Sequence, residues 1–139
     1  LRELSSGLGI GDRVVLTGRY TQNQAVPLLQ SAHMLIHTKY NDPCPRMIVE
    51  AMSCGLPVIY SASGGAHELV GDTAGVGVPV PQGWDRLHAP AAESLADAVD
   101  TVVKGYTGFR EAARRIAVEK LDVNSWLTRH SELFRSMLS

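Results

Sequence analysis

Residues 42–70 read DPCPRMIVEAMSCGLPVIYSASGGAHELV, and this stretch decides the fold. The segment 46–54 is apolar over a helical length, Gly55 is placed to end that helix, and Pro57 follows shortly beyond. Residues 57–61 are a short apolar run of the kind found in buried strands. A helix, a strand, a glycine pair and a second short helix predict one repeat of an α/β fold.

The same alternation continues outward along the chain. Short apolar runs at 14–17, 34–38, 57–61 and 76–80 predict about four strands, and 23–32 predicts a helix with Pro27 in its opening turn. Strands alternating with helices are typical of a Rossmann-like parallel sheet covered on both faces. We therefore predict a single α/β domain over residues 1–139.

The pattern changes after Pro81, where residues 81–90 predict a long surface loop and the rest of the chain predicts three amphipathic helices. Three apolar stripes at helical spacing carry this prediction: Leu95, Val99 and Val102; Phe109, Ala113 and Ile116; and Trp126, His130, Leu133 and Met137.

Composition excludes several classes of function. The chain has 139 residues, 45% of them hydrophobic and 19% charged, which is unlike a disordered protein. Its formal net charge is −1, without a basic half, so no nucleic-acid partner is expected. No apolar run approaches the roughly 20 residues of a membrane span. We interpret the chain as cytoplasmic.

The two cysteines, Cys44 and Cys54, are ten residues apart and form no Cys-x-x-Cys pair, and no histidines lie at ligand spacing beside them. No metal site is predicted. Both lie in apolar surroundings, so we expect two buried free thiols, with a redox role as the alternative.

Two carboxylates lie around the start of the helix at 46–54. Glu50 is inside an apolar helix that we expect to be buried, where an unpaired charge would cost several kcal/mol, so a protein donor or a ligand must satisfy it. Asp42 precedes Pro43-Cys44-Pro45, a stiff approach that presents the amides of residues 46–48 to an anion, although Pro45 itself has none. The alternatives are a turn role for Asp42 and a packing gap beside Glu50.

Glycines follow two of the predicted strands. Gly64 and Gly65 follow the strand at 57–61, at the edge where open α/β sheets bind ligands, and allow a backbone to approach a ligand closely. A plain tight turn is the alternative. Gly18 follows the predicted strand at 14–17 and is a weaker candidate for the same edge.

Taken together, residues 42–70 resemble the donor-binding half of retaining nucleotide-sugar glycosyltransferases of the GT-B fold, family 4 or group 1 type. Two acids separated by seven residues, A-M-x-C-G-x-P-V and G-G-x-x-E form the core of that signature, and all three are present here. The resemblance extends to 14–18, to 34–37 and to Ser125-Trp126, and so covers nearly all of the chain.

The resemblance implies a role for each matching residue. Glu50 matches the acid that binds the ribose hydroxyls, and Asp42 matches the catalytic-site acid that contacts the donor sugar, which is normally glutamate. Pro45, Arg46 and Met47, with Cys44 before them, match the segment whose backbone meets the sugar and the diphosphate. The implied reaction is hexosyl transfer from a nucleoside diphosphate sugar, the donor substrate, to an acceptor hydroxyl with retention and without a metal or other cofactor.

The resemblance also implies parts that find no match in this sequence. These are an arginine and lysine pair that stabilises the diphosphate, the first two strands of the donor domain, and the N-terminal domain that binds an acceptor glycan or lipid-linked sugar. We therefore expect a partial donor-binding domain that is inactive alone. Its parent enzyme would act in polysaccharide or glycoconjugate synthesis, in the cytoplasm or peripherally at the inner face of the membrane. The alternative is a non-catalytic sugar-nucleotide binding or regulatory module.

A sheet without its first two strands has an unpaired edge, which must be covered. We expect either that the strand at 14–17 pairs directly with the strand at 34–38, or that two chains associate along this edge.

Overall fold

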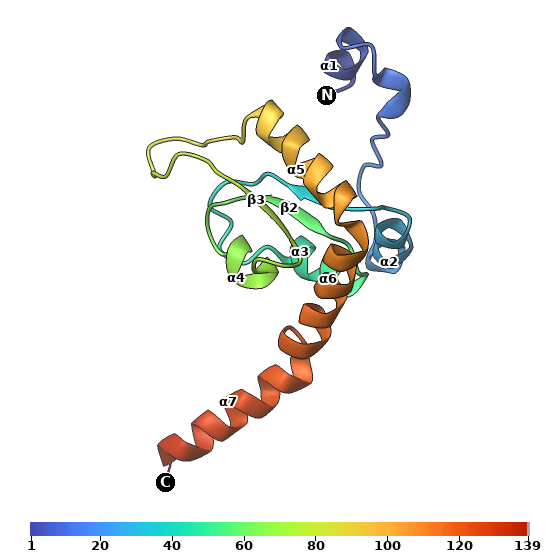
Figure 1. Ribbon diagram of the computed structural model, residues 1–139. Helices are drawn as coiled ribbons and strands as arrows, with labels where there is room; N and C mark the ends of the chain where they lie inside the picture. Colours follow the sequence, from blue (N-terminus) through green and yellow to red (C-terminus); the bar gives the residue numbers. More distant parts are fainter. Residues whose placement is uncertain (139) are drawn as a thin grey trace.

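The computed structural model describes residues 1–138, in which a three-stranded parallel sheet is flanked by helices (Figure 1). Strand β1 (Leu35–His37) pairs with β2 (Val58–Ser61), and β2 pairs with β3 (Gly75–Val78). Seven α-helices and one 3-10 helix complete the described chain: α1 (Arg2–Gly7), η1 (Gly11–Arg13), α2 (Gln22–Gln30), α3 (Arg46–Ser53), α4 (Ala66–Val70), α5 (Ala92–Lys104), α6 (Tyr106–Lys120) and α7 (Val123–Leu138).

Strand β2 lies at the centre of the sheet and is buried on both faces. Val58 and Tyr60 pack with α3, α4 and α6 on one face. Ile59 points the other way and packs with Val78 and with Val102 of α5. This two-sided burial explains why the strand is a continuous apolar run instead of an alternating one.

Helix α3 confirms the predicted segment at 46–54 and its end at Gly55. Gly55 has a φ of +75°, and its amide donates to the carbonyl of Met52 at 2.9 Å, which closes the last turn. The prediction that this helix is buried all round is wrong, because only Ile48, Ala51 and Met52 are buried. The other face is open toward α2.

The strand predicted at 14–17 does not form within the described residues, so the sheet has three strands instead of about four. This segment contacts no strand through its backbone, and Val15 is 81% exposed. The expected pairing with β1 is therefore wrong. Strand β1 remains an edge strand, with Ile36 47% exposed.

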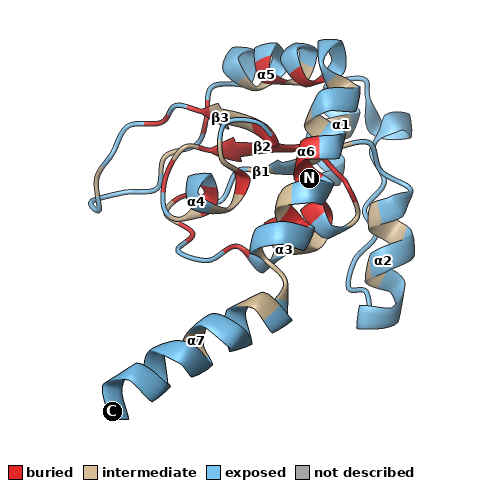
Figure 2. Ribbon diagram, turned by 60° about the horizontal axis from the view of Figure 1, so that its bottom comes forward, coloured by how far each residue is buried: buried red, intermediate tan, exposed pale blue. Residues whose placement is uncertain are grey.

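Helices α2 and α7 differ from what the sequence predicts. Helix α2 begins at Gln22, so Pro27 lies beyond its first turn and not in it. The three C-terminal helices form as predicted, but α7 buries none of its residues. In its predicted stripe Trp126, Leu133 and Met137 are exposed and His130 is half-buried. Figure 2 shows α7 extending away from the buried centre of the molecule.

Candidate functional site

The predicted site lies where the parallel strands end. Strand β1 is followed by residues 38–45, β2 by 62–65, and β3 by the loop at 79–91, and these connections meet at one edge of the sheet. Contacts between them are direct, because the amide of Asn41 donates to Ser63 Oγ at 3.0 Å and Gln82 Nε2 donates to the carbonyl of Ala62 at 3.1 Å. This edge is the one at which open α/β sheets bind ligands.

Asp42 is held at this edge by two cationic or polar neighbours. It is only 8% exposed, and its Oδ2 lies 3.1 Å from His37 Nε2 and 3.3 Å from Lys39 Nζ. Burial raises the pKa of Asp42, but hydrogen bonding and charge from Lys39 and then from His37 outweigh it and hold the pKa below its ordinary value of 3.8. The carboxylate is thus ionised and fixed in orientation.

Gly64 and Gly65 bring the loop after β2 against the backbone next to Asp42. The amide of Gly65 donates to the carbonyl of Asp42 at 2.9 Å, and a Cβ at either glycine would collide with the carbonyl of Asp42 or Pro43. Gly64 also has a φ of +64°. The close approach that these glycines allow is therefore to the chain's own Asp42–Pro43 backbone, which fixes the position of the carboxylate.

The N-terminus of α3 presents two backbone amides. Pro45 occupies the cap position, and the amide of Ile48 donates to the carbonyl of Pro45 at 3.0 Å. The expectation that the Ile48 amide is free to bind an anion is therefore wrong. The amides of Arg46 and Met47 have no acceptor among the described residues. Two N–H groups at the positive end of a helix favour an anion there.

Cys44 precedes this helix end and is exposed, and Cys54 is half-buried, so the expectation of two buried thiols is wrong. Both are free. The two prolines around Cys44 keep the segment extended and outside the helix, which leaves the thiol at the surface.

Glu50 does not occupy a buried position. Its side chain is 41% exposed and lies 3.8 Å from the Arg46 guanidinium, one turn earlier on α3. It lines a cleft of about 760 Å³ between α2 and α3, together with Tyr20, Arg46 and Met47. Arg46 is thus an ion-pair partner beyond hydrogen-bond distance, and the carboxylate is open to a ligand in the cleft.

The structure brings most of the predicted residues to two adjoining places, the sheet edge at Asp42 and the cleft at Glu50, with the N-terminus of α3 between them. Gly18 is the exception, because it lies in an exposed segment with no atom within 4 Å of where a Cβ would stand. Two residues further on, Tyr20 does reach the cleft, and its hydroxyl lies 3.7 Å from Met47 Sδ.

Sequence reasoning missed Lys39, Tyr20 and Tyr40. The signal available for Lys39 and Tyr40 was their position immediately after a strand at the ligand-binding edge. The buried Tyr40 hydroxyl lies 3.0 Å from the carbonyl of Pro81 and 2.9 Å from that of Gly83, and so holds the loop at 79–91 against the edge.

Replacing Tyr40 by phenylalanine is expected to release this loop. Loss of the hydroxyl leaves the carbonyl of Pro81 without this donor, while the carbonyl of Gly83 keeps the Asn41 side-chain amide at 3.3 Å. We expect this to cost about 1 kcal/mol and to raise amide hydrogen exchange within residues 81–88. Hydrogen exchange followed by mass spectrometry measures the effect. Tyr106→Phe is the matched control, because no hydrogen bond of the Tyr106 hydroxyl is found in the described chain; equal exchange in both variants would contradict the prediction.

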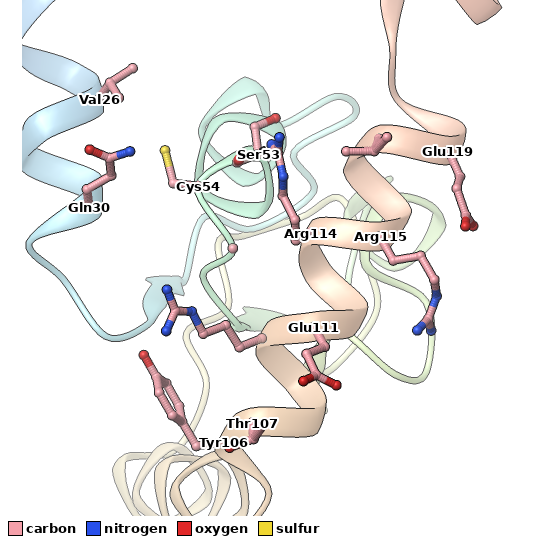
Figure 3. Close-up of a pocket in the computed structure, with 13 residues that line it drawn as sticks. Val26, Gln30, Ser53, Cys54, Tyr106, Thr107, Glu111, Arg114, Arg115 and Glu119 are labelled. Atoms are coloured by element: carbon pink, nitrogen blue, oxygen red, sulfur yellow. Dashed lines mark hydrogen bonds between the residues drawn. The ribbon is translucent and has the colours of Figure 1, made fainter.

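A second and larger groove, of about 960 Å³, lies between α2, the end of α3 and α6 (Figure 3). Val26 and Gln30 of α2 face Cys54 across it, and Arg114 of α6 donates to the carbonyl of Ser53. Arg114 therefore satisfies the C-terminal end of α3. None of Asp42, Gly64 and Gly65 lines this groove.

Residues 1–138 contain neither a candidate metal site nor a candidate membrane span. No three His, Cys, Asp or Glu side chains there are grouped so that they could hold a metal ion. No helix there is both long enough and apolar enough to cross a bilayer.

Comparison with known proteins gives consistent matches. Residues 1–119 match the family model described as glycosyl transferases group 1. The D-inositol 3-phosphate glycosyltransferase of Mycobacteroides abscessus is 30% identical over 137 residues, which are 98% of this chain and 28% of that protein. The phosphatidylinositol N-acetylglucosaminyltransferase gpi3 subunit of Schizosaccharomyces pombe is 24% identical over 127 residues, 91% of this chain and 26% of that protein.

Solved structures agree with the fold. The sucrose-phosphate synthase of Thermosynechococcus elongatus superposes with a TM-score of 0.78 at 23% identity, over 98% of this chain and 33% of that one. HepE of Anabaena, solved in complex with UDP and glucose, gives 0.74 at 27% identity, over 96% of this chain and 35% of that one. The chain thus spans between a quarter and about a third of the length of these relatives.

Proposed function

Because this chain belongs to the glycosyl transferases group 1 family, we propose that it is part of the donor-binding domain of a retaining GT-B glycosyltransferase and binds a nucleoside diphosphate sugar. One observation carries the proposal: Asp42 at the sheet edge and Glu50 in the α2–α3 cleft lie on either side of a helix end with two free amides. Carboxylates accept from hydroxyls, and the helix end favours a diphosphate between them.

In this arrangement the nucleoside occupies the α2–α3 cleft. Glu50 accepts hydrogen bonds from the ribose hydroxyls, and Tyr20 offers an aromatic surface at the same cleft. Arg46, 3.8 Å from Glu50, supplies positive charge there. HepE of Anabaena, 27% identical to this chain, was solved in complex with UDP and glucose, which supports a nucleotide as ligand of this chain.

The sugar then lies toward Asp42, with the diphosphate at the amides of Arg46 and Met47. In the whole enzyme the bond from the anomeric carbon to the diphosphate breaks and a bond to the acceptor oxygen forms on the same face. The acceptor's proton leaves with the nucleoside diphosphate. Helix amides stabilise the charge on the leaving group because they are already oriented toward it.

The remaining parts of the proposal concern the whole protein. A further domain binds an acceptor glycan or lipid-linked sugar, the reaction belongs to polysaccharide or glycoconjugate synthesis, and it takes place in the cytoplasm, with the enzyme peripheral at the inner membrane face. Residues 1–139 alone are inactive. The uncovered edge at β1, where Ile36 is exposed, supports self-association of this part along that edge.

Titration with UDP-, GDP- and ADP-glucose tests the donor site. One of the three nucleotide sugars is expected to bind, and Glu50→Gln is expected to weaken that binding about tenfold, because a charge-assisted hydrogen bond to the ribose is lost. Calorimetry gives both dissociation constants. Glu93→Gln, which removes an exposed acid in the first turn of α5, is the matched control. Equal affinity of wild type and Glu50→Gln would contradict the role given to Glu50.

A further inference from the structure

The carboxylate of Asp42 has one oxygen occupied and one free. Both His37 Nε2 and Lys39 Nζ contact Oδ2, at 3.1 and 3.3 Å, whereas no donor among the described residues contacts Oδ1. The backbone carbonyl of Asp42 is taken by the amide of Gly65. The side chain can therefore accept one further hydrogen bond, at an oxygen whose orientation the other contacts hold.

The ammonium of Lys39 has N–H donors that its contact with Asp42 does not use. Its ammonium carries three N–H groups, and within residues 1–138 its one ion pair is to Asp42. The Lys39 side chain is 66% exposed, against 11% for that of Asp42. Lys39 thus presents unused N–H donors to solvent beside the free acceptor of Asp42, two residues beyond the end of β1.

No other charged group competes at this position in the described chain. The loop at 63–65 contributes a serine hydroxyl and backbone groups, and the guanidinium of Arg46 on α3 is paired with Glu50. His37 and Lys39 are the titratable groups that contact Asp42.

An acceptor and a donor that lie side by side match the chemistry of neighbouring hydroxyls on a sugar ring. One hydroxyl donates to a carboxylate oxygen, while the oxygen of the next accepts from an ammonium. We propose that Lys39 is a specificity-determining residue for the donor sugar, which it and Asp42 bind together through one adjacent pair of hydroxyls. This rests on the proposed function and adds a residue that contacts the sugar and not the nucleotide.

The test separates sugar binding from nucleotide binding. UDP, GDP and ADP are each titrated with and without their glucose moiety, and the ratio of the two dissociation constants measures what the sugar adds. Lys39→Met is expected to reduce this ratio about fivefold for the nucleotide that binds, and to leave binding of the nucleoside diphosphate unchanged. Lys39→Arg keeps the charge and is expected to retain most of the effect.

Lys104→Met, at the last residue of α5, is the matched loss of one exposed lysine. An unchanged ratio in Lys39→Met, with nucleotide still bound, overturns this inference alone. Failure of wild type to bind any of the three nucleotides overturns the proposed function, and this inference with it.

A carboxyl NMR titration tests the Lys39–Asp42 contact without a ligand. The pKa of Asp42 is lowered in the folded chain, so its ionisation stabilises the fold above pH 3.8, and this stabilisation is lost as the pH falls through the folded pKa. Lys39→Met is expected to raise the pKa of Asp42. The variant loses one of the two groups that stabilise the ionised carboxylate, while burial still favours the protonated form. An unchanged pKa would show that the pair does not form in solution.

Discussion

Replacing Gly65 by alanine is expected to lower the free energy of unfolding by roughly 2–3 kcal/mol. A Cβ at this position would collide with the carbonyl of Pro43, which is backbone and cannot rotate away. To make room, the loop after β2 must move from the segment at 42–43 and lose the hydrogen bond from its own amide to the carbonyl of Asp42. Chemical denaturation followed by circular dichroism measures the change.

Gly108→Ala is the matched control for this substitution. Gly108 lies in α6 with no atom within 4 Å of its Cβ position, so alanine there is expected to stabilise the chain by about 0.5–1 kcal/mol through its higher helix propensity. Equal and small effects at the two glycines would show that the contact between the loops is not tight. Because Asp42 is held by this contact, donor binding is expected to weaken in Gly65→Ala together with stability.

The sequence was sufficient to predict the ligand-binding edge of the sheet and some of the residues that lie there. Strand β2 and the end of α3 at Gly55 follow from apolar runs and helix-end chemistry, which depend on a few adjacent residues. Gly64 and Gly65 were predicted at this edge because open α/β sheets bind ligands at the carboxyl ends of their strands, and Asp42 was predicted beside the start of the helix at 46–54. What the glycines contact was not predictable, since it depends on how closely two loops approach in space.

Predictions that a given side chain is buried were wrong at several positions. Glu50 and Cys44 were expected inside, because their neighbours in sequence are apolar, yet both lie on open surfaces. The segment at 14–17 has β-branched residues suited to a strand, but a strand also needs a partner for its backbone, and none is present for it in the described chain. A local sequence pattern indicates which side chains favour burial. It does not indicate whether another helix or strand covers them in the folded chain.

Two adjacent residues of helix α3 allow a covered apolar side chain to be compared with an uncovered one. Ile48 is fully buried in the cluster formed by α3, β2, α4 and α6, so Ile48→Ala is expected to cost about 3 kcal/mol through lost burial and the cavity that remains. Val49 lines the open α2–α3 cleft, and Val49→Ala is expected to cost less than about 1 kcal/mol, mostly because little surface is re-exposed.

Urea denaturation of the two variants at one pH gives both values. Similar large losses would mean that Val49 is as well covered as Ile48 in solution, as it would be if self-association or another part of the protein closed the cleft. In that case nucleotide could reach Glu50 only after the cover moves, and the affinity of the isolated chain would fall by the fraction of molecules that are closed. A large loss at Ile48 alone would establish that the cleft beside Glu50 is open and accessible to a donor.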